Sequence, residues 1–131
     1  MPATSLEMLS TGIRALLETS QEADRRRDAE LFASILAPEG TFQLGPFPEV
    51  QGRGAVRESV AAFFATIADM DQRFLRGWEH PGGLVYEAEV SYRLVTGAEV
   101  TIPYCNVWDV SDGLISRYRV YIDLAAMRDA G

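Results

Sequence analysis

The sequence is poor in the residues that build disulfides and metal sites. It contains one cysteine, Cys105, and one histidine, His80. A lone cysteine cannot form an internal disulfide, which is typical of proteins in a reducing compartment. Cys105 and His80 together are also too few soft ligands for a structural zinc site. We therefore expect a cytoplasmic protein that binds no metal ion.

Positive charge is scarce as well. The chain has 12 Lys and Arg residues against 19 Asp and Glu, a net charge of -7, whereas nucleic-acid binding needs clustered cations that neutralise phosphates. The longest uncharged apolar segment, residues 59–68, is about half a membrane span. Glu7 lies where a signal peptide would carry basic residues. We expect a soluble, unprocessed chain without nucleic-acid or membrane partners.

Length and composition favour a single domain. The 131 residues are 47% hydrophobic, which is enough for one core and too little for a second domain. The glycines of residues 45–54 lack the spacing of a phosphate-binding loop. We therefore treat residues 1–131 as one domain and expect no cofactor.

The N-terminal part of the chain has the pattern of two helices. Apolar residues recur at helical intervals over residues 5–26, behind the capping-box spacing of Thr4 and Glu7. Asp28 is suited to cap a short second helix that extends to residue 36. A third amphipathic pattern follows further along the chain, over residues 55–70.

Strand patterns occupy the rest of the sequence. A brief strand over residues 41–44 precedes the third helix. After that helix the apolar period changes to two, and short turns separate four runs: residues 72–79, 84–95, 99–110 and 114–124. These turns predict an antiparallel meander, and its long strands require a sheet that bends around the helices.

The last strand ends on a carboxylate, Asp123, among apolar neighbours. Alternation places two groups of side chains on opposite faces of this strand: Arg117, Arg119, Tyr121 and Asp123 on one, and Tyr118, Val120 and Ile122 on the other. Asp123 is thus a candidate for acid/base chemistry. The alternative is a structural residue that caps the following segment or pairs with an arginine.

The segments DAELFASILAPEGTF, PEVQGRGAVRESVAAFF and NVWDVSDGLISRYRVYIDL resemble, in sequence and order, the SnoaL-like branch of the nuclear-transport-factor-2-like superfamily. This resemblance implies a cone-shaped α+β half-barrel, with three N-terminal helices packed on a strongly curved, mostly antiparallel sheet around a pocket. The superfamily includes ketosteroid isomerases, polyketide cyclases, limonene-type epoxide hydrolases, dehydratases and pockets without catalysis, so the fold alone does not select an activity.

The resemblance also suggests site residues. Leu44 occupies the place of the proton-abstracting aspartate of ketosteroid isomerases, and only Asp123 remains of the Asp-Arg-Asp set of limonene-type epoxide hydrolases. SnoaL-like cyclases have an aspartate at the end of the last strand and a polar residue beside it, here Asn106. The implied catalytic residues are Asp123, Asn106, Tyr104 and Glu89. For Glu89 the alternative is a salt bridge to Arg93 or Arg119.

The same resemblance implies an apolar pocket with few polar groups. Beside the catalytic candidates, the implied wall comprises Phe42, Leu44, Glu87, Ser91, Arg93, Ile102, Trp108 and Tyr121, closed by Leu31, Ile35, Phe63, Phe64 and Ile67. A carboxylate desolvated there would have a raised pKa, which suits an acid or base near neutral pH.

We therefore predict a cofactor-independent general acid/base enzyme, an isomerase, cyclase or lyase, for a small, largely apolar carbonyl or polyketide-like molecule. The alternatives are an epoxide-hydrolase-like enzyme, in which Asp123 activates water, and a non-catalytic ligand-binding or dimerisation module. A homodimer is expected through the outer face of the sheet, on which we place an apolar stripe: Ala88, Val90, Tyr92 and Leu94.

Overall fold

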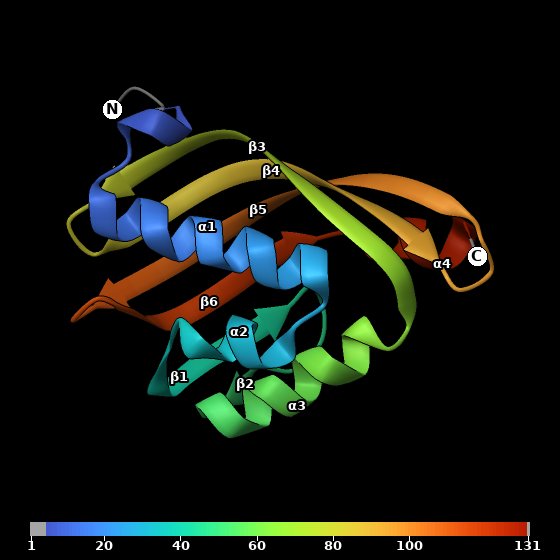
Figure 1. The fold of residues 1–131 in the computed structure, drawn as a ribbon, viewed down its shortest axis with the longest axis horizontal. Helices are drawn as coiled ribbons and strands as arrows, with labels where there is room; N and C mark the ends of the chain where they lie inside the picture. The colour runs from blue at the N-terminus through green and yellow to red at the C-terminus, as the bar shows by residue number, and fades with distance from the viewer. Residues whose placement is uncertain (1–4, 131) are drawn as a thin grey trace.

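The computed structural model describes residues 5–130 and shows helices that cover one face of a curved sheet (Figure 1). The helical elements are the 3-10 helix η1 (Leu6–Met8), α1 (Thr11–Arg26), α2 (Ala29–Ser34), α3 (Arg53–Phe64) and α4 (Ala125–Ala130). The strands are β1 (Leu36–Leu44), β2 (Val50–Gln51), β3 (Ile67–His80), β4 (Gly83–Leu94), β5 (Glu99–Ser111) and β6 (Leu114–Ile122). Between residues 5 and 130 no helix is long and apolar enough to cross a membrane.

The sheet has the predicted meander at its centre. Its strand order is β2-β1-β6-β5-β4-β3, and all neighbours are antiparallel except β1 and β6. Register shifts between Phe74 and Arg76, and between Asp109 and Val110, interrupt the pairing of the long strands. Such bulges bend a strand and increase its twist. The predicted α+β fold with a strongly curved, mostly antiparallel sheet is confirmed.

The first helix begins later than predicted. Thr4, the expected cap, lies outside the described residues, and α1 follows Ser10, which has extended dihedral angles. The backbone N–H of Ser10 donates to Oε1 of Glu79 on β3, at 2.8 Å. α1 ends at Arg26, and the left-handed conformation of the following Arg27 lets its N–H reach the carbonyls of Ala23 and Asp24. Between these two ends, α1 lies across the concave face of the sheet (Figure 1).

The second helix is shorter than predicted, although its cap is as expected. Asp28 accepts a hydrogen bond from the Leu31 N–H at 3.0 Å. Leu36 already belongs to β1, where it pairs with Ile115 of β6. β1 is therefore longer than the predicted strand over residues 41–44, because the parallel pairing with β6 begins directly after α2.

The third helix ends at Phe64, and the prediction that it continues to residue 70 is wrong. Thr66 closes its last turn, since both its N–H and its hydroxyl donate to the carbonyl of Phe63. Ile67 and Met70 belong to β3 and are still buried, because a register shift lies between Ile67 and Asp69. An apolar spacing of three residues therefore fits this bulged strand as well as a helix.

The apolar stripe of β4 faces the helices, so its predicted place on the outer face is wrong. Ala88 pairs with Tyr104 and Val90 pairs with Ile102, and cross-strand partners share a face of the sheet. All four are buried. The outer face carries ion pairs instead, Arg76 with Glu87 among them. The predicted homodimer therefore loses the apolar surface on which it was based.

Candidate functional site

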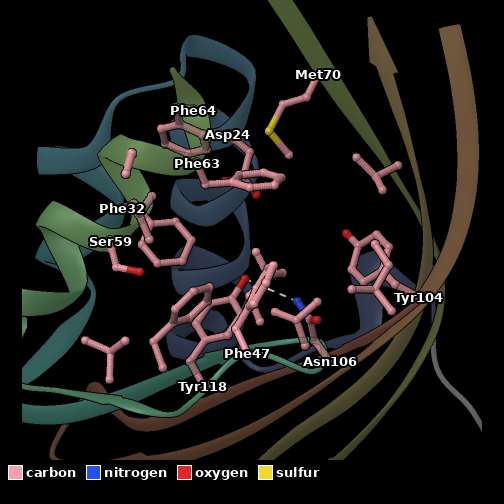
Figure 2. A pocket seen from close by; sticks show the side chains of 18 of the residues that line it. Asp24, Phe32, Phe47, Ser59, Phe63, Phe64, Met70, Tyr104, Asn106 and Tyr118 are labelled. Carbon is pink, nitrogen blue, oxygen red and sulfur yellow. Dashed lines mark hydrogen bonds between the residues drawn. The ribbon is translucent and has the colours of Figure 1, made fainter. Parts of the chain in front are cut away.

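A cavity of about 400 Å³ lies between the concave face of the sheet and helices α1, α2 and α3 (Figure 2). We call it the cone pocket. Its polar lining residues are Asp24, Ser59, Thr66, Gln72, Tyr92, Tyr104, Asn106 and Tyr118. Its apolar lining residues are Phe32, Phe42, Leu44, Phe47, Pro48, Val50, Val60, Ala62, Phe63, Phe64, Met70, Val90, Val120 and Ile122. This size and composition suit a drug-sized, mostly hydrophobic ligand.

Asp24 is the titratable acid of the cone pocket. It lies in the last turn of α1, and its residue is only 4% exposed. Burial raises the pKa of its carboxyl to about 8, against a smaller opposing effect of the hydrogen bond that Gln72 Nε2 donates to Oδ2. A carboxyl that titrates near neutral pH can act as either a general acid or a general base.

A chain of buried hydrogen bonds holds Asn106 at the floor of the pocket. Its Nδ2 donates to the hydroxyl oxygen of Tyr86 at 2.7 Å and to that of Tyr118 at 3.2 Å. The Tyr118 hydroxyl lies 3.0 Å from Oγ of Ser20 on α1. The network therefore joins β4, β5, β6 and α1. It uses the amide nitrogen of Asn106, while its amide oxygen has no hydrogen-bond partner in the described part of the chain.

Three polar atoms on the pocket wall are buried without a hydrogen-bond partner among the described residues: Tyr104 OH, Asn106 Oδ1 and Gln72 Oε1. Each such atom costs about 1–3 kcal/mol, and buried polar atoms of this kind are commonly completed by a ligand or water. Burial raises the pKa of Tyr104 well above its ordinary value, so its hydroxyl stays protonated. The wall thus offers a hydroxyl donor and two amide acceptors.

Several residues predicted for the pocket do line it. Tyr104, Asn106, Phe42, Leu44, Phe63 and Phe64 are all on its wall. Four other predicted residues are buried in the core and do not line the cavity: Ile35, Ile67, Ile102 and Trp108. Leu31 packs against that core. Catalytic roles for Tyr104 and Asn106 stay predictions.

The predicted place of Asp123 in the pocket is wrong. Asn106 pairs with Val120 of β6, whereas Cys105 pairs with Tyr121, so the odd-numbered end of β6 belongs to the outer face. Tyr121 is 54% exposed. Asp123 is exposed as well and accepts a hydrogen bond from the Ala125 N–H at 3.0 Å. It thus has the capping geometry that the sequence left open as its alternative.

The odd-numbered residues of β4 also lie outside the pocket, for the same reason of register. Glu89 forms an ion pair with Arg73, and not with either arginine considered above. Glu87 likewise points outward and pairs with an arginine of β3. Ser91 Oγ lies 2.9 Å from Thr101 Oγ1. Arg93 extends toward Asp69 at 3.9 Å. None of these β4 side chains lines the cone pocket.

Sequence reasoning missed Asp24 and Gln72. A signal for Asp24 was present, because the buried face of α1 runs through Ile13, Leu17 and Ser20 and reaches Asp24 four residues later. A carboxylate on the apolar stripe of a helix is rare unless it has a partner or a function. Gln72 gave no such signal, since its importance depends on which helix crosses β3.

Comparison with known proteins identifies a family and several solved structures of the same fold. The model of the SnoaL-like domain family matches residues 13–118. An LEH-like epoxide hydrolase of M. tuberculosis is similar with a TM-score of 0.74 and 18% identity, over 91% of this chain and 87% of that one. A protein with a ketosteroid isomerase-like fold from Catenulispora acidiphila, in complex with trimethylamine, has a TM-score of 0.80 and 14% identity, over 88% and 90%. TerC, co-crystallised with polyporic acid, has a TM-score of 0.80 and 17% identity, over 92% and 98%.

Proposed function

Because this chain belongs to the SnoaL-like domain family, we propose that it is a general acid/base enzyme acting on a small, largely apolar carbonyl compound. The observation that carries the proposal is the buried carboxyl of Asp24. It lines the same cavity as the hydroxyl of Tyr104, which has no hydrogen-bond partner among the residues that the structure describes. Asp24 takes the role that the sequence suggested for Asp123.

The proposed reaction begins with the ionised carboxylate of Asp24. It removes a proton from the carbon next to the substrate carbonyl, and the C–H electron pair forms the enolate while negative charge moves onto the oxygen. The hydroxyl of Tyr104 donates a hydrogen bond to that oxygen, where a fixed donor stabilises the developing charge. If a C=C double bond is conjugated with that enolate, the charge extends to a dienolate, and protonated Asp24 returns its proton to the far (γ) carbon, which gives an isomerase. In a cyclase, the enolate carbon instead attacks a second carbonyl, and protonated Asp24 gives its proton to the alkoxide that forms.

The raised pKa of Asp24 fits this role. At about 8, it makes the carboxylate a stronger base than an exposed aspartate, while a useful fraction is still ionised near neutral pH. Asn106 is held by Tyr86 and Tyr118, so its free oxygen has a fixed position on the wall. That oxygen accepts a hydrogen bond from a hydroxyl or enol of the substrate, and the aromatic wall binds the rest.

The structure bears differently on the epoxide-hydrolase-like enzyme and on the non-catalytic binding module. Asp123 is exposed outside the cone pocket, so it is not placed to activate a water molecule inside it. A non-catalytic binding module needs only the cavity. The experiment below separates it from the enzyme.

Proton abstraction can be measured without the natural substrate. The wild-type protein is incubated in D2O with a panel of cyclic ketones such as 2-tetralone, and NMR follows exchange of the protons next to the carbonyl. We expect faster exchange than in buffer, and Asp24→Asn should lower the protein-catalysed rate by about a hundredfold or more. Asp123→Asn is the matched control and should leave the rate unchanged.

Two results would contradict the enzyme proposal. One is an equal exchange rate in a well-folded Asp24→Asn variant. The other is binding of the ketones without any exchange above buffer by the wild type. The first result would exclude Asp24 as the base, and the second would favour the binding module.

A further inference from the structure

We infer that the cone pocket also takes hydrophobic ammonium ions, with the charged nitrogen paired to the carboxylate of Asp24. The inference goes beyond the proposed catalysis because such a ligand binds and does not react. It would compete with the substrate for the same cavity.

The first argument is the charge of the pocket wall. Among its described lining residues, Asp24 is the only acidic or basic side chain. Arg27, three residues further on, points elsewhere and pairs with Asp69 at 3.2 Å. Arg93 is also directed at Asp69. Once ionised, the Asp24 carboxylate has no cation among the described lining residues, which is costly for a buried charge, and a ligand cation would offset that cost.

The second argument is the aromatic character of the same wall. Figure 2 shows Asp24 on the helical side of the cavity together with the rings of Phe63 and Phe64, which α3 supplies. The ring of Phe63 lies edge to face with that of Tyr92, with centroids 5.9 Å apart. Ring faces attract ammonium ions, and this attraction grows when the site is desolvated. A carboxylate lined by such rings is a receptor for an organic cation.

The third argument is the type of free hydrogen-bonding atom. Asn106 Oδ1 and Gln72 Oε1 are acceptors on the wall that have no partner within residues 5–130, and Asn106 is only 1% exposed. An ammonium N–H can donate to an amide oxygen as well as to a carboxylate. An anionic ligand would meet these oxygens and Asp24 without any cation to offset them, so the pocket should reject it.

Proton linkage supports the inference. The polar groups that face Asp24 are Gln72 on β3 and the tyrosines of β4, β5 and β6, namely Tyr92, Tyr104 and Tyr118. Burial raises the pKa of each tyrosine above its ordinary value, so these rings stay neutral. Because the pKa of Asp24 is about 8, an ammonium ion that binds at pH 7 must displace the Asp24 proton. Affinity should therefore rise up to about tenfold per unit between pH 6 and pH 8.

The test uses four probes that share one ring system. Isothermal titration calorimetry at pH 8 compares naphthalen-1-ylmethylammonium, its N,N,N-trimethyl derivative, the neutral naphthalen-1-ylmethanol and the anion 1-naphthoate. We expect both cations to bind about tenfold or more tighter than the alcohol, and 1-naphthoate to bind weakest. Asp24→Asn should abolish the preference for the cations but keep binding of the alcohol. Asp123→Asn, which removes an exposed carboxylate, should keep the preference.

The wild-type protein alone gives a second readout, in case Asp24→Asn folds poorly. Titrations at pH 7 in two buffers of different ionisation enthalpy should show release of close to one proton per trimethylammonium probe bound. Equal affinity for the cations and the alcohol, or the absence of proton release, would overturn the inference. Neither measurement involves turnover, so failure here is distinguishable from failure of the proposed catalysis.

Discussion

The side-chain amide of Gln72 donates a hydrogen bond to the buried carboxyl of Asp24, although 48 residues separate the two in the sequence. One residue belongs to the last turn of α1 and the other to β3. The bond holds the carboxyl at the wall of the cone pocket. It also partly opposes the effect of burial on the pKa of Asp24, which keeps the group in a range useful for acid/base chemistry.

Asp24 should make folding stability depend on pH. The folded protein keeps the Asp24 proton up to about pH 8, whereas the unfolded chain releases it near the ordinary value of 3.8. The folded state therefore holds more protons between these pH values. The contribution of Asp24 to the free energy of unfolding falls as pH rises, by at most about 1.4 kcal/mol per pH unit. Above pH 8 this contribution is constant.

Urea denaturation of the wild type and of Asp24→Asn at pH 5, 6, 7, 8 and 9 measures this effect. The asparagine has no proton to lose, so the free energy of unfolding of the variant should gain on that of the wild type from pH 5 to pH 8. Parallel curves for the two proteins would contradict a raised pKa at Asp24.

Two tyrosines of the pocket should respond in opposite ways to loss of the hydroxyl. The hydroxyl of Tyr104 has no partner within residues 5–130, so Tyr104→Phe should leave stability unchanged or raise it. The hydroxyl of Tyr118 accepts from Asn106 and lies within hydrogen-bond distance of Ser20. Tyr118→Phe should therefore cost about 1–2 kcal/mol.

The rate of ketone proton exchange should fall more in Tyr104→Phe than in Tyr118→Phe, although Tyr118→Phe is the less stable variant. Tyr104→Phe removes the proposed donor to the substrate oxygen and should lower the exchange rate by about tenfold or more. A large loss of stability in Tyr104→Phe, measured by urea denaturation, would show instead that its hydroxyl has a structural partner.

Asp123 should prove structural. Its carboxylate accepts from the N–H of Ala125, the first residue of α4, two positions further on, and Asn can replace Asp as the acceptor in such a turn. We expect Asp123→Asn to keep the melting temperature, and Asp123→Ala to lose about 1 kcal/mol or less. Both variants should retain ketone exchange and ligand affinity. A hundredfold loss of exchange in a stable Asp123→Asn variant would restore the assignment made from the sequence.

The errors in the predicted site come from two identifiable sources. On β4 the alternation of apolar residues from Leu84 to Leu94 indicates the correct inner face, which carries the even-numbered residues. The family resemblance instead implied that the odd-numbered residues face the pocket. At the end of β6 the register with β5 decides which side chains face inward. That register is a property of the paired sheet, and one residue of difference moves every side chain to the other face.

Local patterns in the sequence were enough to predict the three main helices and the antiparallel meander, because turn residues and apolar periodicity act over a few residues. The family resemblance added the interior placement of Tyr104 and Asn106. The identity of the buried carboxyl was decided only by the tertiary structure. Asp24 is desolvated because α1 crosses the concave face of a sheet formed by residues far along the chain. Asp123 is exposed because the odd-numbered residues at the end of β6 lie on the outer face of the sheet. Burial of a single polar side chain depends on such long-range packing, and no local pattern specifies it.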